Sequence, residues 1–343
     1  MTAPLDGVER LLVVAPSWVG DAVMATPLLR ALRATRPAAR IAALVKPGLE
    51  EVLAGSPWLD ETFAVRPGVL WPWRGLGPAR RFRAQAVLLL PNSFRSALAA
   101  LPLAPRRIGR ARDGRSWLLT HRLSGRTRGP VPAVDWYADL GEFALGATIA
   151  DRRPELHVTA AEAARAEELL QGASGPLIVL NPGANREDKR WPAERFGQVG
   201  ARLADQFGAA VAVTGSPAER PVLERVVAAY AAAPGSRPAL LDLQARGVRL
   251  GSLKGVLRRA SLLISNDTGP RHLAIGLGTP VVSLFGPTDH RWTTIAGAVE
   301  RRLLAEPFLP EQLAADDVPA ACRIDRISPE DVRQAAAALL GAA

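Results

Sequence analysis

The 343-residue chain is 48% hydrophobic and 22% charged, which is typical of a globular protein that is long enough for two domains. Its single cysteine, Cys322, excludes an intramolecular disulfide framework and a cysteine-rich zinc cluster, and because the sequence shows no membrane span and no secretory signal, a reducing, cytoplasmic location is expected. The formal net charge of +10 is uneven: residues 1–150 carry 20 cations and 11 acids, a net of +9, so any anionic partner would meet the first half of the chain.

Short apolar runs alternate with helical patterns along the first half, an order typical of parallel strands joined by crossover helices. Strands are expected at Arg10–Ala15, Arg40–Val45, Glu61–Val65, Gln85–Leu90 and Arg106–Gly109. Helices are expected at Asp21–Arg36, Leu49–Ser56, Ser93–Leu101 and Ala133–Leu145. These elements predict a doubly wound α/β unit over residues 1–160.

The pattern restarts after a polar connector within residues 151–174. Strands are expected at Leu177–Asn181, Ala210–Thr214, Ala239–Leu243, Ser261–Ser265 and Pro280–Phe285. Helices are expected at Pro192–Phe207, Pro217–Tyr230, Leu250–Arg259 and Gly269–Gly276. These elements predict a second doubly wound unit over residues 161–327.

A last helical pattern, Ser328–Leu340, opens with an N-cap serine, a proline and two acids. Because it follows the strands of the second sheet, we expect the segment 328–343 to pack back on the first unit. Open parallel sheets bind ligands at the carboxyl ends of their strands, so we expect the two units to face one cleft.

The first strand ends in Pro16-Ser17-Trp18-Val19-Gly20-Asp21, a turn that leads into a helix. An acid at that position can simply stabilise the helix N-terminus through the unpaired N–H groups and the helix dipole. It can also act as a general base, provided that the proton it removes lies within hydrogen-bond reach. The position of Asp21 leaves both interpretations open.

The turn Asn181–Pro192 combines Gly183 and Asn185, which let the backbone turn sharply, with the adjacent cations Lys189 and Arg190 ahead of a helix. Cations beside a helix N-terminus favour a phosphate site, although a surface loop with solvated charges fits the same residues. The chain has no G-x-x-x-x-G-K-[ST] sequence, so a P-loop is excluded.

The segment Leu262–Ala274 runs from a buried strand through four small polar residues into a helix. The N–H groups around Thr268 and Gly269 would point past the strand end, an arrangement that binds an anion, with Asp267 and His272 on either side. His272 can equally be a locally bonded helix histidine, although it lies one turn after Thr268 and so returns to the same loop.

A similar turn, Thr214–Glu219, places the carboxylate of Glu219 where it can accept two bonds from a ribose diol. Other motifs are missing from the sequence, among them a D-x-D pair for a metal-bound nucleotide sugar, H-E-x-x-H, G-x-S-x-G and C-x-x-C. The sequence therefore predicts no metal site and no cofactor.

The stretch from Arg74 to Arg128 has 13 arginines and one acid, Asp113, a local charge of +12. Two strand ends in it are followed by Asn92, Ser93, Arg95, Arg110 and Arg115. Because the planar guanidinium group recognises carboxylates and phosphates, an acidic acceptor is expected here; a solvated arginine surface is the plainer alternative.

Four ordered segments together resemble glycosyltransferase family 9, the lipopolysaccharide heptosyltransferases, and most of all its heptosyltransferase II members. These segments are Ser17–Asp21, Asn92–Ser96, Pro182–Ala184 with Lys189–Pro192, and Asn266–Gly269 with His272. The resemblance implies a GT-B fold made of two Rossmann-like units. It also implies metal-independent, inverting transfer of L-glycero-D-manno-heptose from ADP-heptose to the Kdo/heptose inner-core lipid of lipopolysaccharide.

The resemblance further implies roles for individual residues. Asp21 would be the base, Lys189 would hold the diphosphate and the heptose, and Glu219 would bind the ribose. Within the Asn266–Gly269 segment, the diphosphate would lie against the last two residues and the donor sugar against the aspartate. The other donor-binding residues would be Gly183, Asn185, Asp267, Thr268, Gly269 and His272, the last of these as support for the loop.

The acceptor-binding residues implied in the same way are Ser17, Trp18, Asn92, Ser93, Arg95, Arg110 and Arg115. Because the acceptor is anchored in a membrane, peripheral contact of the protein with the inner-membrane surface is expected through arginines. An alternative is a related transferase that uses another nucleotide sugar or glycan. A non-enzymatic alternative is an anionic-surface or nucleic-acid binder through Arg74–Arg128, but it leaves the loops of the second half unexplained; no nucleic-acid partner is therefore expected.

Overall fold

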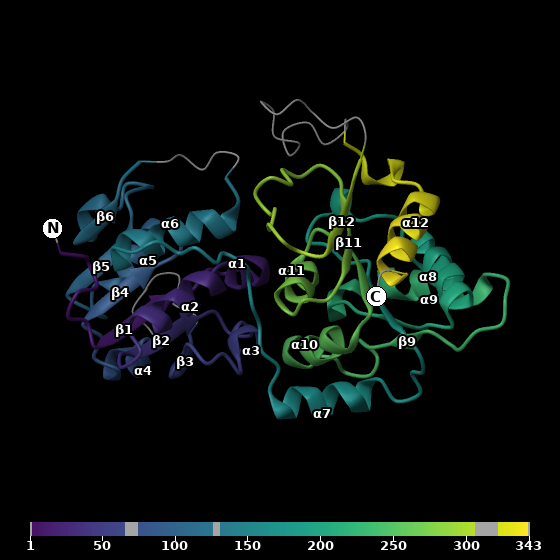
Figure 1. Cartoon of the computed structure of the whole chain (residues 1–343), viewed down its shortest axis with the longest axis horizontal. Coiled ribbons are helices and arrows are strands. Elements are labelled where there is room, and N and C mark those ends of the chain that lie inside the picture. The colour runs from purple at the N-terminus through teal and green to yellow at the C-terminus, as the bar shows by residue number, and fades with distance from the viewer. Residues whose placement is uncertain (1, 66–74, 126–130, 306–321, 342–343) are drawn as a thin grey trace. The chain divides into compact units, whose positions relative to one another are not determined.

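The computed structural model describes residues 2–65, 75–125, 131–305 and 322–341 (Figure 1). The chain divides into two compact units. The first comprises Met1–Leu156 together with Arg291–Ala296, and the second comprises His157–His290 together with Gly297–Ala343. Within the described residues, no helix combines the length and the hydropathy that crossing a bilayer requires.

The first unit contains a six-stranded parallel sheet in the order β3-β2-β1-β4-β5-β6. Its strands are β1 (Arg10–Val14), β2 (Arg40–Val45), β3 (Glu61–Ala64), β4 (Ala86–Leu89), β5 (Arg106–Arg110) and β6 (His121–Leu123). Leu12 at the centre of the sheet lies opposite Ala42 and Val87 and is fully buried. The direction of the strand order reverses between β1 and β4, and such a switch point is where open α/β sheets bind ligands.

The helices of the first unit are α1 (Val19–Met24), α2 (Thr26–Thr35), α3 (Glu50–Leu53), α4 (Gly77–Arg81), α5 (Phe94–Ala100) and α6 (Ala133–Leu145). The single helix predicted over Asp21–Arg36 is therefore two helices that meet at Ala25. Pro27 is the cause, because it has no N–H to donate to the carbonyl of Val23. The hydroxyl of Thr26 donates to that carbonyl instead, at 2.7 Å.

The second unit repeats this topology with the order β12-β11-β10-β7-β8-β9, again all parallel. Its strands are β7 (Leu177–Asn181), β8 (Ala210–Val213), β9 (Leu241–Asp242), β10 (Leu262–Asn266), β11 (Val281–Phe285) and β12 (Glu300–Leu304). Its helices are α7 (Ala160–Leu169), α8 (Ala193–Phe207), α9 (Arg220–Ala232), α10 (Leu250–Arg259), α11 (Gly269–Gly276) and α12 (Pro329–Leu340). The switch point of this sheet lies between β7 and β10.

The C-terminal helix α12 corrects one expectation, because it packs on the second unit and not on the first. It lies against α8 and the strands β10, β11 and β12 (Figure 1). Val332 and Ala336, one turn apart, form its buried stripe and join the core of that unit. The chain ahead of α12 is fastened there too, since the indole N–H of Trp191 donates to the carbonyl of Ile327 at 2.9 Å.

The packing of α8 on α9 leads to a prediction about Gly197. A Cβ atom at Gly197 would lie 2.8 Å from the Cβ of Ala229 and 2.8 Å from the backbone nitrogen of Tyr230. Backbone atoms cannot move aside as a side chain can, so Gly197→Ala is expected to lower the free energy of unfolding by about 1–3 kcal/mol despite the better helix propensity of alanine.

Urea denaturation followed by circular dichroism measures this change. Gly77→Ala is the control, since a Cβ at Gly77 meets no atom of the described residues within 4 Å. Equal midpoints for the two variants would contradict close helix packing at Gly197.

Candidate functional site

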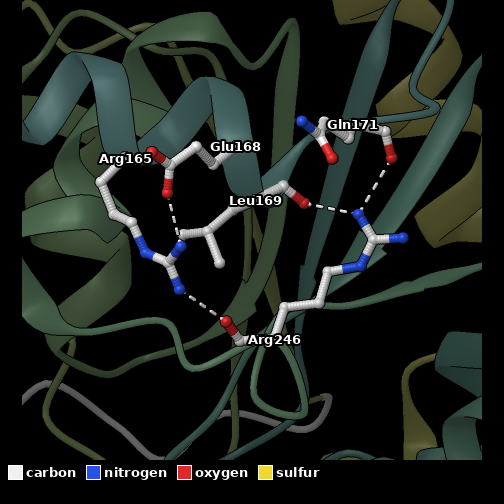
Figure 2. A pocket seen from close by; sticks show the side chains of 5 residues that line it. All are labelled: Arg165, Glu168, Leu169, Gln171 and Arg246. Carbon is white, nitrogen blue, oxygen red and sulfur yellow. Dashed lines mark hydrogen bonds and ion pairs between the residues drawn. The ribbon is translucent and has the colours of Figure 1, made fainter.

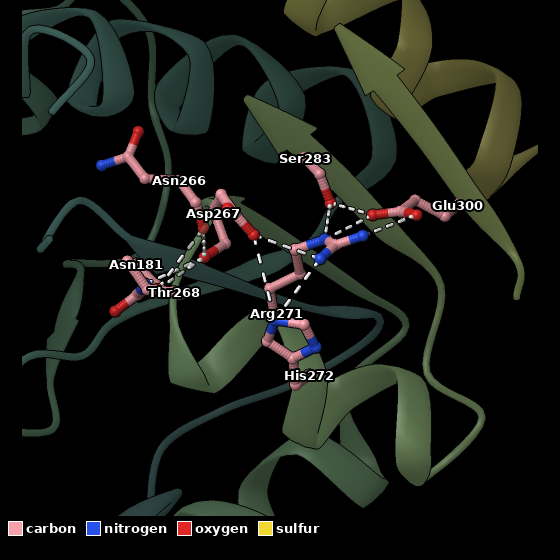
Figure 3. A network of polar contacts seen from close by, with 9 residues as sticks. Asn181, Asn266, Asp267, Thr268, Arg271, His272, Ser283 and Glu300 are labelled. Carbon is pink, nitrogen blue, oxygen red and sulfur yellow. Dashed lines mark hydrogen bonds and ion pairs between the residues drawn. The ribbon is translucent and has the colours of Figure 1, made fainter. Parts of the chain in front are cut away.

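The candidate site of the second unit lies at its switch point, where the loops after β7 and β10 meet (Figure 3). The side-chain amide of Asn181, the last residue of β7, donates to the hydroxyl oxygens of Ser265 at 2.9 Å and Thr268 at 2.8 Å. Asn181 is buried, and both partners belong to the β10 strand end and the turn that follows it. This amide therefore joins the ends of two neighbouring strands.

Asn266, the last residue of β10, makes the reciprocal connection to the loop after β7. Its amide donates to the carbonyls of Pro182 at 2.8 Å and Gly183 at 3.2 Å, and its carbonyl oxygen accepts from the backbone N–H of Trp191 at 3.2 Å. The side chain is completely buried. Because it satisfies groups at both ends of the loop, Asn266 fixes the course of the segment that carries Lys189.

Thr268 and Gly269 begin α11 in the arrangement expected of an anion site. Thr268 is the N-cap residue, but its hydroxyl makes no capping bond and accepts the amide of Asn181 instead. The N–H groups of the first turn are therefore not capped by that side chain, and Pro270 has none to offer. This helix end can bind a phosphate group.

Asp267 lies in the same turn, and its side chain is 10% exposed. Burial raises the pKa of its carboxyl group, while the positive charges of Arg271 and Lys189 act in the opposite direction. Lys189, the cation that acts on Asp267 from the loop after β7, is half-buried. The two predicted donor-site residues are thus coupled electrostatically, although 78 positions separate them in the sequence.

Arg271 and Glu300 are parts of this network that lie outside the site predicted from the sequence. Arg271 is completely buried on α11 and contacts Asp267, Ser283 and Glu300, which comes from β12 (Figure 3). The sequence signal for Arg271 was its place one turn after Asp267, an i,i+4 pairing of opposite charges. Glu300 had no such signal, because it lies 29 residues away in an edge strand.

His272 is buried beside the same cluster, with its Nε2 atom 3.9 Å from Oδ1 of Asp267. Burial, and then the charge of Arg271, hold its pKa well below the usual value, so the ring is neutral at physiological pH. Its Nδ1 atom has no hydrogen-bond partner among the described residues. His272 therefore lies beside the loop as predicted, as an uncharged ring.

Glu219 lies directly against Gly183, so the turn after β8 also reaches the loop after β7. Its Oε2 atom accepts hydrogen bonds from the backbone N–H of Ser216 at 2.7 Å and from its hydroxyl at 2.8 Å. Oε1 faces Gly183 so closely that a Cβ atom there would overlap it. Asn185, further along the loop, is exposed, and Arg190 is held by the carbonyl of Ala184.

In the first unit, Asp21 is half-buried in the first turn of α1, which follows β1. Ser17 and Trp18 precede it and are exposed, Trp18 to 65%. The position agrees both with stabilisation of the helix end and with a carboxylate presented at the ligand edge of the sheet.

Arg110 and Arg115 differ from the expectation of acceptor ligands, because both are buried and hold the protein's own groups. Arg115 is fully buried and donates to the carbonyls of Arg110 and Pro91 and to the side chain of Asn92. The Arg110 guanidinium lies 3.8 Å from the Trp136 ring centroid and donates to the carbonyl of that residue at 2.7 Å. These arginines shape the edge of the sheet from within.

The exposed part of that edge carries aromatic rings. Ser93 caps α5 by accepting from the N–H of Ser96 at 3.2 Å, and Arg95 after it is exposed. Phe94 and Trp117 touch each other with ring centroids 6.0 Å apart, and Trp117 is 71% exposed. These two rings were not among the predicted site residues. The ends of the arginine stretch, residues 74 and 126–128, lie outside the described residues.

A separate hollow in the second unit is explained by helix capping (Figure 2). Arg246 donates to the carbonyls of Leu169 at 2.7 Å and Gln171 at 3.0 Å at the C-terminal end of α7, and Arg165 pairs with Glu168. Cations there satisfy the last carbonyls of the helix.

Among the described residues, no three His, Cys, Asp or Glu side chains are grouped as metal ligands.

Residues 78–310 match the family described as glycosyltransferase family 9 (heptosyltransferase). Lipopolysaccharide heptosyltransferase 2 of Escherichia coli strain K12 is 27% identical over 298 residues, which cover 83% of this chain and 84% of that protein. Among solved structures, the glycosyl transferase family 9 protein of Veillonella parvula matches with a TM-score of 0.82 at 25% identity, covering 98% of each chain. The structure of E. coli ADP-heptose lipopolysaccharide heptosyltransferase II matches with a TM-score of 0.79 at 24% identity, covering 97% of this chain and 99% of that one. The predicted GT-B fold is confirmed by these structures.

The contact between Gly183 and Glu219 can be tested with a single methyl group. Gly183→Ala is expected to push the Glu219 carboxylate away from Ser216. If Glu219 accepts hydrogen bonds from a ribose, as the family resemblance implies, this variant should weaken binding of a nucleoside diphosphate such as ADP by roughly 10-fold, since a hydrogen bond to a charged group contributes about 1.5–3 kcal/mol. Isothermal titration calorimetry measures the affinity.

Glu219→Ala provides the matched background, because it removes the side chain that the new methyl group would meet. Adding Gly183→Ala to this background should cause no further loss of affinity. A further loss would show that the methyl group acts on something other than Glu219.

Proposed function

The chain belongs to glycosyltransferase family 9 (heptosyltransferase), and from this premise we propose that it transfers L-glycero-D-manno-heptose from ADP-heptose to the inner core of lipopolysaccharide. The similarity to lipopolysaccharide heptosyltransferase 2 over 83% of the chain supports this substrate class. The observation that carries the proposal is the N-terminus of α11 at the β7–β10 switch point, which Asn181 and Asn266 tie to the loop that carries Lys189.

The second unit would bind the donor. The first-turn N–H groups at Thr268 and Gly269, together with the Lys189 ammonium group, would hold the diphosphate. Glu219 would accept hydrogen bonds from the ribose hydroxyls, and Asp267 would accept them from the heptose. Gly183 and Asn185 would line the same loop, and His272 would support the turn as a neutral ring.

The first unit would bind the acceptor and supply the base. Asp21 would take the proton from an acceptor hydroxyl as its oxygen forms a bond to the anomeric carbon of the heptose. The bond from that carbon to the phosphate oxygen would break with inversion, and ADP would leave with the electron pair. Lys189 and the N–H groups of α11 would stabilise the charge on ADP without a metal ion.

The acceptor side would use exposed groups at the ends of β1 and β4. Ser17, Trp18, Ser93 and Arg95 are exposed, and Asn92 beside them is half-buried and held by Arg115. Because the acceptor is a membrane-anchored lipid, we propose that the first unit also makes peripheral contact with the inner-membrane surface. The exposed Phe94–Trp117 pair supports this, since aromatic residues are favoured where an apolar phase meets water.

The reaction itself is tested by product analysis. The protein, ADP-heptose and a core acceptor truncated before or after its first heptose should give an acceptor heavier by one heptose, detected by mass spectrometry, together with free ADP. The reaction should proceed at an undiminished rate in EDTA. Transfer from a different nucleotide sugar, with none from ADP-heptose, would contradict the proposed donor.

The base is tested by Asp21→Asn, which is expected to lower kcat by roughly 100- to 10,000-fold, the range over which positioned bases act. The loss of a first-turn charge should itself destabilise the helix by only about 0.3–1 kcal/mol.

Asp331→Asn is the matched control, since Asp331 is also an acid in the first turn of a helix, α12. It should leave kcat unchanged. If Asp21→Asn kept wild-type turnover, Asp21 would have only the helix-stabilising role.

A further inference from the structure

The guanidinium group of Arg271 lies between two carboxylates that come from different elements (Figure 3). Nε and Nη2 donate to the two carboxylate oxygens of Glu300 at 2.7 and 3.0 Å, and Nη1 donates to Oδ1 of Asp267 at 3.2 Å. The group also lies 5.0 Å from the centroid of the Phe285 ring. Both edges of the planar guanidinium are therefore engaged at once.

The charges in this network have no evident value for stability. Arg271 is completely buried, and the side chain of Glu300 is only 5% exposed. A buried ion pair loses so much hydration that apolar side chains of similar volume often stabilise a protein equally well or better. Charges retained at such a place suggest that their geometry serves the site beside them.

We propose that Arg271, braced by Glu300, is a positioning residue that fixes the Asp267 carboxylate so that its Oδ2 atom meets the sugar of the nucleotide donor. The inference rests on the proposed function. It gives a positioning role to Arg271 and Glu300, which lie outside the predicted site. Arg271 holds Oδ1 of Asp267, whereas Oδ2 accepts no hydrogen bond from any described residue. One oxygen is therefore anchored and the other is left for the ligand.

Glu300 makes the anchor rigid. An arginine side chain alone has several rotatable bonds, but the two-pronged contact with a carboxylate fixes both its position and its plane. Ser283 on β11 adds a contact to Nε of Arg271 at 3.1 Å and hydrogen-bonds to Glu300. The orientation of Asp267 is thus determined by two strands of the sheet through Arg271, and not by the turn alone.

The charged and titratable groups that face Asp267 give the proposal a second readout. Arg271 and Lys189 lower the pKa of its carboxyl group, Glu300 raises it, and His272 beside it is neutral. Removing the charge of Arg271 should therefore raise this pKa, whereas removing the charge of Glu300 should lower it. These opposite shifts follow from the two charges, so an acid limb of donor use that moves with them would identify Asp267 as the group whose ionisation the donor requires.

The test measures binding of ADP-heptose and of ADP, each without acceptor, by isothermal titration calorimetry. Arg271→Gln should weaken ADP-heptose roughly 10- to 100-fold relative to ADP, the range expected when a hydrogen bond to a charged group is lost. The affinity for ADP alone should be nearly unchanged, because other groups bind the nucleotide. Glu300→Gln keeps a hydrogen-bond acceptor and should show the same effect to a smaller extent.

Arg237→Gln is the matched control for removing a buried arginine. The Arg237 side chain is 6% exposed and pairs with Asp205, away from the switch point. This variant should lose stability but keep the wild-type ratio of the two affinities. If Arg271→Gln does not fold, the affinity ratio and the pH profile of Glu300→Gln test the positioning role.

The pH profile of kcat/KM for the donor supplies the second readout. Its acid limb should move to higher pH in Arg271→Gln and to lower pH in Glu300→Gln. In an Asp267→Asn background, Arg271→Gln should cause no additional loss of the ADP-heptose affinity relative to that of ADP.

Three outcomes would overturn the proposal: an unchanged affinity ratio in both variants, acid limbs that do not move in opposite directions, or an undiminished effect of Arg271→Gln in the Asp267→Asn background. A wild-type protein that neither binds nor uses ADP-heptose would instead contradict the proposed function, and the positioning role would fall with it.

Discussion

A buried amide must satisfy its donors and its acceptor, and this requirement ties together the two loops at the switch point of the second unit. Asn266 is completely buried and finds all its partners in the loop after β7, while Asn181 finds its partners at the end of β10. Neither strand end could move without leaving an amide unpaired. The positions of Lys189, Asp267 and the first turn of α11 all depend on these few hydrogen bonds.

The first unit joins its loops with a different chemical group. Arg115 fastens the segment after β4 to the segment after β5, where the second unit uses asparagines between β7 and β10. Burial lowers the pKa of Arg115 to about 10, so it is still protonated at neutral pH. An arginine adds a positive charge to the edge that it shapes, whereas asparagine adds none. Uncharged asparagine side chains suit the second unit, because Arg271, Lys189 and Glu300 already set the charge balance around Asp267.

Most of the fold could be predicted from the sequence because parallel strands buried on both faces appear as continuous apolar runs. The strands that were missed, β6 and β12, are edge strands: His121-Arg122-Leu123 and Glu300-Arg301-Arg302 carry charges that such positions tolerate. The split of the first helix at Ala25 could have been found from Pro27. The placement of α12 could not, because its apolar stripe shows that it packs on something without showing on which unit.

The residues of the site also fall into those that the sequence predicts and those that it does not. Residues within one turn, such as Thr268 and Gly269, follow from the strand–turn–helix pattern, since the backbone itself presents their N–H groups. Partners brought together only by the fold were out of reach, as Glu300 shows. The prediction for Arg115 failed for a related reason. Within a run of arginines, the sequence does not distinguish a buried arginine that links two loops from an exposed one. Only the burial of the side chain distinguishes them.

The pKa shifts at the switch point show what the site does to stability. Burial raises the pKa of Asp267, so the folded protein binds a proton more readily there than the unfolded chain does, and this contribution to stability is lost as the pH rises through the raised value. The pKa of His272 is lowered, so its contribution is present at neutral pH and is lost as the pH falls below the ordinary histidine value of about 6.5. At neutral pH the His272 ring is uncharged, whereas the positive charges of Arg271 and Lys189 favour the ionised form of the Asp267 carboxyl group against the effect of its burial. The sugar hydroxyls of a bound donor would also favour the ionised form, because they can donate hydrogen bonds to the carboxylate without changing the net charge around it.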